Sequence, residues 1–300
     1  MAGSQDFEDD PRNATALVWL DGALVPRSEA KVSLFDGGFG MGDGVWEGLR
    51  LHKGRLLFLE AHLDRLLAGA AAIRLDIGLG RAELIAALEA VVAANGMTDG
   101  AHLRLMVTRG VKATINQDPR NALGQPTIAI TAEHKRPAHA QRGLALATVS
   151  VRCTPAEMFD MRLNSHSRLN LITALLEAID LGADEALMLD PRGCVSSCNA
   201  TNFFFVSDGE VKTSAGAYCF NGVTRGHVIA LCRRHGLPLR LGDFPPEPAR
   251  AAEEAFVTGT LGGITPVRSL DGAVFPACPG PVTSRLTALY EALKDADAAR

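Results

Sequence analysis

No run of this 300-residue sequence is apolar for long enough to cross a lipid bilayer, because its long helix-like stretches carry charged residues. The first residues are acidic and lack an apolar centre, so we expect no secretion signal. Six cysteines without such a signal are expected to remain reduced thiols. The sequence therefore predicts a cytoplasmic protein that neither enters a membrane nor depends on disulfides.

Excess positive charge is absent too. The formal net charge is −4 and the isoelectric point is about 6.1, which argues against a nucleic-acid-binding face. Cys194 and Cys198, in CVSSC, suggest a metal site as an alternative. Their spacing is wider than that of a zinc knuckle, and no second Cys/His pair lies nearby. We therefore expect no metal and no nucleic acid.

Lysine is missing from a long central part of the chain, between Lys135 and Lys212. This part includes residues 163–178, LNSHSRLNLITALLEA, which change from a polar, turn-like start to an apolar run typical of a helix. Any reaction that needs a lysine amine in this segment is therefore excluded.

The length predicts two domains, or one large domain with additions. Residues 1–14 are polar and acidic, and we expect them to be disordered. Residues 15–136 are predicted to form a small α+β domain, and residues 137–300 a larger one. The linker is expected at residues 134–143, HKRPAHAQRG, which are polar and contain a proline.

Strands and helices occur in mixed order, which indicates an α+β fold and not a repeating βαβ fold. A hairpin is predicted around Asp21-Gly22, followed by a strand at residues 31–35 and a glycine-rich loop. Apolar residues recur with helical spacing from Glu60 onward and again in residues 81–95, which predicts two helices. The glycine-rich loop does not open a helix after a strand, so it does not satisfy the context of a nucleotide-binding finger.

The chain carries five motifs in one order, and together they resemble the fold-type-IV pyridoxal-phosphate enzymes. That family includes branched-chain aminotransferases, D-amino-acid aminotransferases and aminodeoxychorismate lyases. The resemblance implies a two-domain D-amino-acid-aminotransferase-like architecture, an active site between the domains and a homodimer. The motifs are AKVSLFDGGFGMGDGVWEGLRLHKGRLLFLEAHLDRL (30–66), LRLMVTRG (103–110), GADEALMLD followed by NFFFV (182–206), NGVTRGHVI (221–229) and TGTLGGITPVRSLDG (258–272).

The resemblance also implies residues for a cofactor phosphate. An anion needs backbone N–H groups at the start of a helix, hydroxyl groups and a cation. Val223 and Thr224 begin a helix-like segment, and Gly259 and Thr260 lie in a glycine-rich turn. Arg65 matches the arginine that family members place against the phosphate. Pyridoxal 5'-phosphate is therefore the expected cofactor.

Two positions that the family uses for chemistry are changed. Matching Arg168-Leu169 to the family's R-L pair puts the expected lysine at Asn164, and another register puts it at Ser167. Arg168 stays protonated and cannot act as an amine nucleophile. The family's glutamate at the pyridine nitrogen is replaced by Ser197, which supplies no negative charge.

Substrate recognition is expected to use arginines, which bind carboxylates in a bidentate manner. Arg109 and Arg104 match positions used near the substrate carboxylate, and both are preferred over Arg50. Trp46 stands where relatives carry Phe or Tyr, so a reshaped pocket is predicted. His166 is the candidate for a substitute base in the lysine-free segment, with an ordinary surface or packing histidine as the alternative.

Three hypotheses follow for a protein that acts on a small carboxylate. The chain is a class IV aminotransferase relative, for amino and keto acids, that holds pyridoxal phosphate without a covalent bond. Alternatively, it is a cofactor-independent enzyme that reuses the anion site for a carboxylate, with or without a phosphate group. The third hypothesis is a non-catalytic, ligand-binding homologue.

Overall fold

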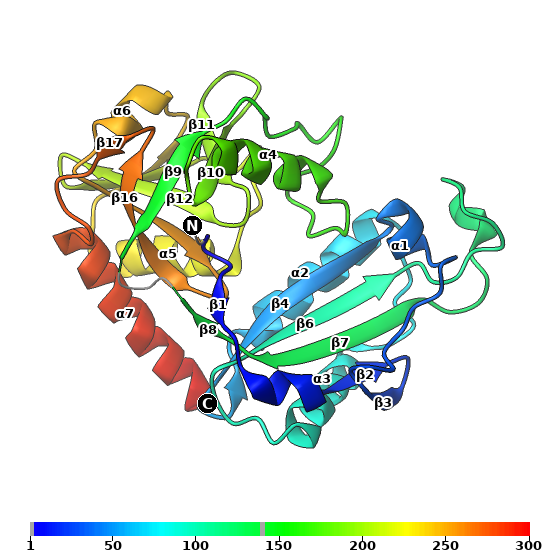
Figure 1. The fold of residues 1–300 in the computed structure, drawn as a ribbon. Helices are drawn as coiled ribbons and strands as arrows, with labels where there is room; N and C mark the ends of the chain where they lie inside the picture. The colour runs from blue at the N-terminus through cyan, green and yellow to red at the C-terminus, as the bar shows by residue number, and fades with distance from the viewer. Residues whose placement is uncertain (1–2, 139–141) are drawn as a thin grey trace. The chain divides into compact units, whose positions relative to one another are not determined.

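The computed structural model describes residues 3–138 and 142–300, which form two compact units (Figure 1). The amino-terminal unit contains Asp9–Arg136, Leu163–Arg168 and Asp297–Arg300. The carboxy-terminal unit contains Met1–Glu8, Pro137–Arg162 and Leu169–Ala296, apart from the residues outside the description. The main division falls inside the expected linker, of which residues 139–141 lie outside the described residues.

The amino-terminal unit consists of one β-sheet with helices packed against it. Its sheet has the strand order β3-β2-β7-β6-β4-β5 within the described residues. Its elements are η1 (Pro11–Thr15), β2 (Leu17–Leu20), β3 (Ala23–Pro26), α1 (Gly37–Met41), β4 (Gly44–His52), β5 (Arg55–Leu56), α2 (Leu59–Ala72), α3 (Arg81–Ala94), β6 (Ala101–Thr108), η2 (Pro119–Asn121) and β7 (Thr127–His134).

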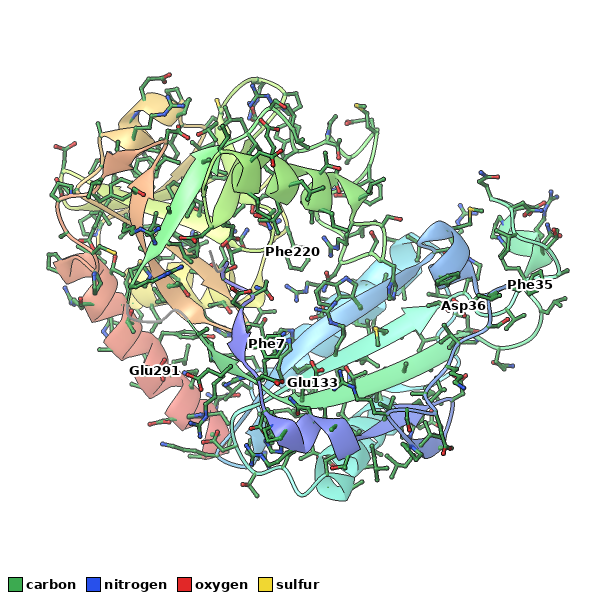
Figure 2. All side chains as sticks on the ribbon, in the orientation of Figure 1. Phe7, Phe35, Asp36, Glu133, Phe220 and Glu291 are labelled. Atoms are coloured by element: carbon green, nitrogen blue, oxygen red, sulfur yellow. The ribbon has the colours of Figure 1, made fainter. Side chains whose placement is uncertain are left out.

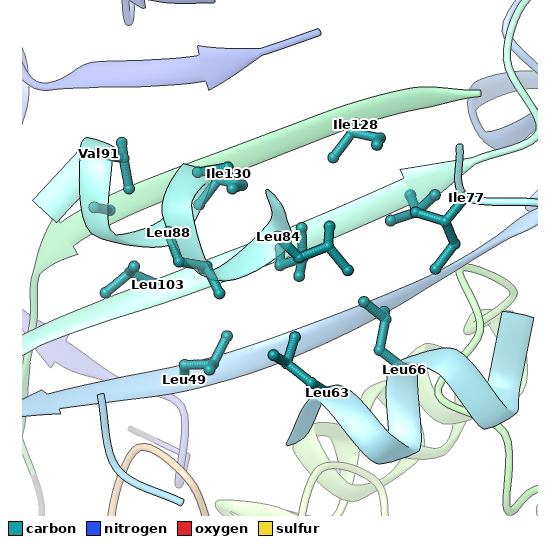
Figure 3. Packing of buried hydrophobic residues seen from close by; sticks show 14 of the residues in the cluster. Leu49, Leu63, Leu66, Ile77, Leu84, Leu88, Val91, Leu103, Ile128 and Ile130 are labelled. Atoms are coloured by element: carbon teal, nitrogen blue, oxygen red, sulfur yellow. The ribbon is translucent and has the colours of Figure 1, made fainter. Parts of the chain in front are cut away.

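Alternation along the strands decides which face of this sheet is apolar. Successive side chains of a strand point to opposite faces. Leu49 and Leu103 point to the face covered by α2 and α3, where they pack with Leu63, Leu66 and Leu84 (Figure 3). Full burial of a leucine side chain contributes about 1.5–3 kcal/mol. The even-numbered residues of β4 and β6 lie on the other face, and they include three candidate site residues.

The carboxy-terminal unit contains a larger sheet with the order β11-β10-β9-β16-β15-β12-β13-β14 and with β17 beside β16. Aromatic rings fill part of its interior, and the rings of Phe204 and Phe256 stack with centroids 4.9 Å apart. Its elements are β1 (Phe7–Glu8), β8 (Arg136–Pro137, at the unit boundary), β9 (Leu144–Thr148), α4 (Leu169–Asp180), β10 (Glu185–Leu189), β11 (Val195–Cys198), β12 (Asn202–Ser207), β13 (Glu210–Ser214), α5 (Val223–Arg234), β14 (Leu239–Gly242), α6 (Pro246–Arg250), β15 (Glu254–Gly259), β16 (Gly263–Leu270), β17 (Ala273–Val274) and α7 (Pro281–Ala298).

The α+β prediction is confirmed, and several local predictions need correction. Residues 3–14 are not wholly irregular, because β1 and most of η1 lie within them. Residues 31–35 do not form the expected strand, since no strand among residues 3–138 and 142–300 pairs with them, and Phe35 is exposed (Figure 2). Residues 163–168 belong to the amino-terminal unit and not to the domain predicted for them. Among the described residues, no helix combines the length and apolar character needed to cross a membrane.

Candidate functional site

The lysine-free segment 163–168 is held against the beginning of β4. The Trp46 amide donates to the Asn164 carbonyl at 2.9 Å, and the His166 amide donates to the Gly44 carbonyl at 3.0 Å. Val45 and Ser165 form an antiparallel bridge between the same two stretches. These backbone bonds extend the amino-terminal sheet, which explains why this segment leaves the unit that contains the helix after it.

The Asn164 side chain is buried and engaged on both of its polar atoms. Its Nδ2 donates to the Trp46 carbonyl at 2.5 Å and lies 3.5 Å from Glu47 Oε1. Its Oδ1 accepts a hydrogen bond from Arg168. An amide held in this way supplies neither a nucleophilic amine nor a base. Among the described contacts of Asn164 there is no lysine.

Glu47, which the sequence analysis did not single out, is the central carboxylate of this region. Arg65 donates to it with Nε at 2.7 Å and with Nη2 at 2.6 Å, and His62 Nδ1 lies 2.7 Å from its Oε2. Burial alone would raise the pKa of Glu47, but the hydrogen bonds from His62 and Arg65 outweigh burial and lower that pKa. The sequence does contain a signal for Glu47. In VWEGLR it is a charged residue at a position where the alternation of the strand predicts a core-facing side chain.

Two guanidinium groups lie over the indole ring of Trp46. The guanidinium carbon of Arg104 is 4.2 Å from the ring centroid, and that of Arg168 is 5.4 Å away. Both distances suit a cation–π interaction. Burial and the positive charges of Arg65 and Arg104 lower the pKa of Arg168 to about 10, so the side chain stays charged at neutral pH. The two guanidinium groups therefore concentrate positive charge at the Trp46 ring.

Arg104 comes from the face of the sheet that α2 and α3 leave uncovered. It lies opposite Gly48 in the β4–β6 register, and Arg50 lies opposite His102. The missing side chain at Gly48 matters, because a Cβ there would lie 3.2 Å from the His102 ring. Burial lowers the pKa of Arg104 as well as that of Arg50. Arg50 also donates to the Lys135 carbonyl at 2.5 Å.

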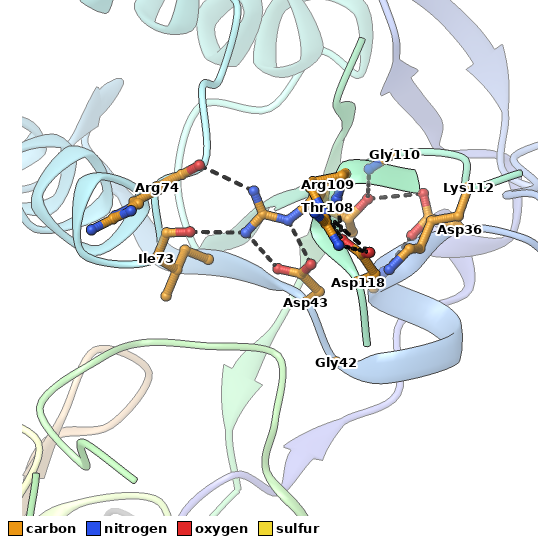
Figure 4. Close-up of polar contacts among 12 residues, drawn as sticks. Asp36, Gly42, Asp43, Ile73, Arg74, Thr108, Arg109, Gly110, Lys112 and Asp118 are labelled. Atoms are coloured by element: carbon orange, nitrogen blue, oxygen red, sulfur yellow. Dashed lines mark hydrogen bonds and ion pairs between the residues drawn. The ribbon is translucent and has the colours of Figure 1, made fainter. Parts of the chain in front are cut away.

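Arg109 has a different surrounding from Arg104. Its Nε and Nη2 bind the Asp43 carboxylate at 2.6 and 2.9 Å, and its guanidinium also donates to the carbonyls of Ile73 and Arg74 (Figure 4). These bonds connect the end of β6 with the loop before β4 and the end of α2. The geometry therefore distinguishes two arginines that the sequence analysis placed together ahead of Arg50: Arg109 is held by Asp43 and two carbonyls, and Arg104 lies over the Trp46 ring.

His166 is part of the same positive region. Burial is the main cause that lowers its pKa, and the charges of Arg104 and Arg168 act in the same direction. Its Nε2 is buried and has no hydrogen-bond partner among the described residues. A neutral imidazole with an unpaired nitrogen has the protonation state required of a general base.

Ser197, the second changed position, lies in the carboxy-terminal unit on β11. Its hydroxyl donates to the Thr201 carbonyl at 2.8 Å and accepts from Asn202 Nδ2 at 3.2 Å. Asn202 also donates to the Phe220 carbonyl and accepts from the Gly222 amide. Ser197 thus fixes the turn after β11 and the loop before α5, and its hydroxyl is already used in both roles.

The start of α5 carries the residues expected to hold a phosphate. Gly222 is its N-cap and gives no side-chain hydrogen bond, so the first amide groups, including those of Val223 and Thr224, point out of the helix end. The Thr224 hydroxyl is buried 3.4 Å from the Tyr290 hydroxyl. In the same unit, Gly259 ends β15 and Thr260 lies in the turn that follows.

Comparison with known proteins agrees with this arrangement. The family model described as "Amino-transferase class IV" matches residues 44–270, so the chain belongs to the class IV aminotransferase family. A "Branched-chain-amino-acid aminotransferase-like protein 2" of Arabidopsis thaliana is 38% identical over 95% of this chain and 51% of that protein. The chain therefore spans about half the length of that relative. A "Putative branched-chain-amino-acid aminotransferase" of Methanocaldococcus jannaschii is 37% identical over 86% of this chain and 88% of that protein.

Solved structures show the same fold. The branched-chain aminotransferase from Thermoproteus uzoniensis with norvaline has a TM-score of 0.84 and 33% identity, and the match covers 92% of this chain and 93% of that chain. A T.th. branched-chain amino acid aminotransferase with pyridoxamine 5'-phosphate has a TM-score of 0.87 and 29% identity, with 94% and 95% covered. The resemblance to fold-type-IV enzymes is confirmed by these matches.

The residues present fit pyridoxal phosphate in one part only. The start of α5 offers amide groups and a hydroxyl suited to a phosphate group. Asn164 offers no amine for a covalent bond, and the Ser197 hydroxyl is engaged within the protein. Asn164 and Ser197 therefore supply neither an amine for a covalent bond to the cofactor nor a negative charge for its pyridine nitrogen.

Proposed function

We propose that this chain is a class IV aminotransferase relative that binds a small amino or 2-oxo acid and forms no covalent bond between a lysine and pyridoxal phosphate. Any pyridoxal phosphate that it takes up is held through its phosphate group. The observation that carries this proposal is the buried Asn164 amide, which is hydrogen-bonded to Trp46 and Arg168 at the position that one register matches to the family's lysine. The other register matches Ser167, whose hydroxyl donates to the Gly42 carbonyl at 3.2 Å. Arg104, over the Trp46 ring on the uncovered face, supports carboxylate binding.

The test is an absorbance titration of the purified protein with pyridoxal phosphate, followed by borohydride reduction and intact-mass measurement. We expect saturable uptake without a permanent mass increase, together with no amino transfer from a branched-chain amino acid to a 2-oxo acid. A stoichiometric mass increase after reduction would overturn the proposal, because a lysine elsewhere would then form the bond. The homodimer and the cytoplasmic location remain predictions from the sequence.

His166 favours a second candidate function, proton transfer at the carbon next to a carbonyl group without any cofactor. A neutral imidazole with an unpaired nitrogen stands in a region of positive charge, which would stabilise the negative oxygen that forms when the proton leaves. The proton passes from the substrate carbon to His166 Nε2 and returns in the reverse step.

This function is measured as deuterium exchange at C3 of 2-oxobutyrate by NMR, with protein stripped of pyridoxal phosphate. We expect His166→Gln to lower exchange about 10²–10⁴-fold, the usual contribution of a positioned base. His52→Gln is the matched control, since His52 lies at the end of β4, beside Asp99. Exchange that is no faster than in buffer, or equal in His166→Gln, would rule out this candidate.

A further inference from the structure

Helix α4 carries its small side chains on the inside of the carboxy-terminal unit and large aliphatic side chains on the outside. Ala174 and Ala178 are fully buried in the apolar cluster that the helix forms with β9 and β10 (Figure 1). A helix that only covers a sheet turns its main apolar stripe towards the core. The outward side chains of α4 include Leu169, Ile172, Leu176 and Ile179, which are 75%, 54%, 56% and 43% exposed.

These four residues form the outer stripe of α4. They are separated by three, four and three positions, and residues three or four positions apart lie on the same face of a helix. The same spacing marks the seam along which two helices pair. No residue of the outer stripe is charged. The outer stripe therefore has the pattern of a contact face for a second helix.

The outer stripe exposes about as much apolar surface as a small dimer interface requires from each copy. With the exposed Leu181 it presents the equivalent of roughly three whole aliphatic side chains, on the order of 350 Å². Two copies would remove roughly 700 Å² of apolar surface from water, and since about 60% of an interface is apolar, the whole interface would be roughly 1,200 Å². That area lies at the lower limit of specific, stable interfaces.

A second copy of α4 matches the outer stripe. Aliphatic side chains at this spacing fit between identical side chains of a facing helix, and a two-fold axis brings the same surface of both copies together. The charged residues of α4 are Glu177 and Asp180, both acidic and both near its carboxy-terminal end. A parallel pair would bring these like charges together, whereas an antiparallel pair separates them. The same acids disfavour an anionic lipid surface, which attracts basic residues.

We propose that α4 is an interface between two copies of this chain, with the outer stripes packed antiparallel across a two-fold axis. Ile172 of one copy then lies against the partner's Leu176, and Leu169 lies against the partner's Ile179. The resemblance implied a homodimer without assigning a surface of this chain to it. The inference rests on the carboxy-terminal unit alone and is independent of the proposed function.

Analytical ultracentrifugation of the full-length protein at about 1–100 µM tests this interface, since an interface of this size is expected to dissociate in the micromolar range. Leu176→Glu places a charge in the outer stripe of both copies. It should weaken association at least about 100-fold, so that the mass of the assembly falls by half. Val274→Glu is the matched control, because Val274 is 78% exposed in β17 of the same unit. A monomeric wild type over this whole range, or equal masses for wild type and Leu176→Glu, would overturn the proposal.

Cysteine cross-linking gives a second measurement without a charged substitution. Leu169→Cys and Ile179→Cys are combined in one chain that also carries Cys278→Ser, which removes the exposed native cysteine. The two positions lie about 15 Å apart along one helix, so a disulfide between them can form only between copies. Oxidation with copper phenanthroline in air should give a linked dimer on a non-reducing gel, and Leu169→Cys alone should not. No linked dimer from the double variant, or an equal yield from the single variant, would refute the antiparallel arrangement.

Discussion

Replacement of Glu47 by glutamine tests whether the buried carboxylate organises the positive region of the amino-terminal unit. Glu47 is fully buried and holds Arg65 through two hydrogen bonds, with His62 on the same carboxylate. Glutamine has nearly the same shape, so the substitution removes the charge without leaving a large cavity. Arg65 would then stay charged and mostly buried, and the Glu47 carboxylate would no longer compensate its charge.

The size of the effect follows from this geometry. Removal of one partner of a buried ion pair costs about 3–5 kcal/mol, because the other charge stays buried without compensation. Arg65 keeps some exposure, 18% of its side chain, so we expect about 3 kcal/mol. The pKa of Glu47 is lowered in the folded protein, and its contribution is therefore present above the usual carboxyl pKa and lost as pH falls through the folded pKa. The difference between wild type and Glu47→Gln should narrow in acid.

Tryptophan fluorescence during urea unfolding measures this effect in one unit. Both tryptophans, Trp19 and Trp46, belong to the amino-terminal unit, so their emission reports that unit. Glu133→Gln is the control (Figure 2), because Glu133 pairs with Arg27 at 3.1 Å between partly exposed side chains. A pair of that kind contributes about 0–1 kcal/mol. A loss below about 1 kcal/mol for Glu47→Gln, or one equal to the control, would refute the reasoning.

Three further changes probe other residues of the site. Asn164→Lys should create a pyridoxal phosphate adduct that borohydride makes permanent, seen by intact mass, whereas Asn164→Gln should not; no adduct would count against the assigned lysine position. Burial lowers the pKa of His102 to about 3, so the unfolded state alone gains a proton as pH falls below about 6.5. The free energy of unfolding should therefore fall by about 2 kcal/mol between about pH 7 and 5, as measured by urea unfolding. This pH dependence should be absent in His102→Gln. An unchanged pH dependence in that variant would exclude His102 as its source. Arg104→Leu should weaken binding of 2-oxobutyrate, measured by calorimetry. Arg109→Leu should chiefly lower the free energy of unfolding, by about 2 kcal/mol, because its hydrogen bonds to Asp43 are lost. Weaker binding in Arg109→Leu and unchanged binding in Arg104→Leu would identify Arg109 as the carboxylate ligand.

Local pattern alone predicted much of the chain. Helical periodicity placed α2 and α3 within a few residues, and the turn at Asp21-Gly22 joins β2 and β3 as expected. The order of motifs identified the family, and the absence of lysine between Lys135 and Lys212 is a fact of the sequence. These features depend on residues close together in the chain, where spacing and turn chemistry act directly.

Tertiary structure decided how the site residues are used. Arg104 lies in β6 and Arg109 directly follows β6, yet Arg109 is bound by Asp43 and two backbone carbonyls, while Arg104 lies over Trp46. Residues 163–168 pair with β4 and so leave the unit of the helix that follows them.

Glu47 and Glu185 show the same division between sequence and structure. The sequence determined that each is a carboxyl group in an apolar stretch. Only the fold placed Arg65 and His62 beside Glu47, and the Thr201 hydroxyl beside Glu185. Charge compensation depends on neighbours that are distant in the chain, and such neighbours are defined only when the sheets are formed.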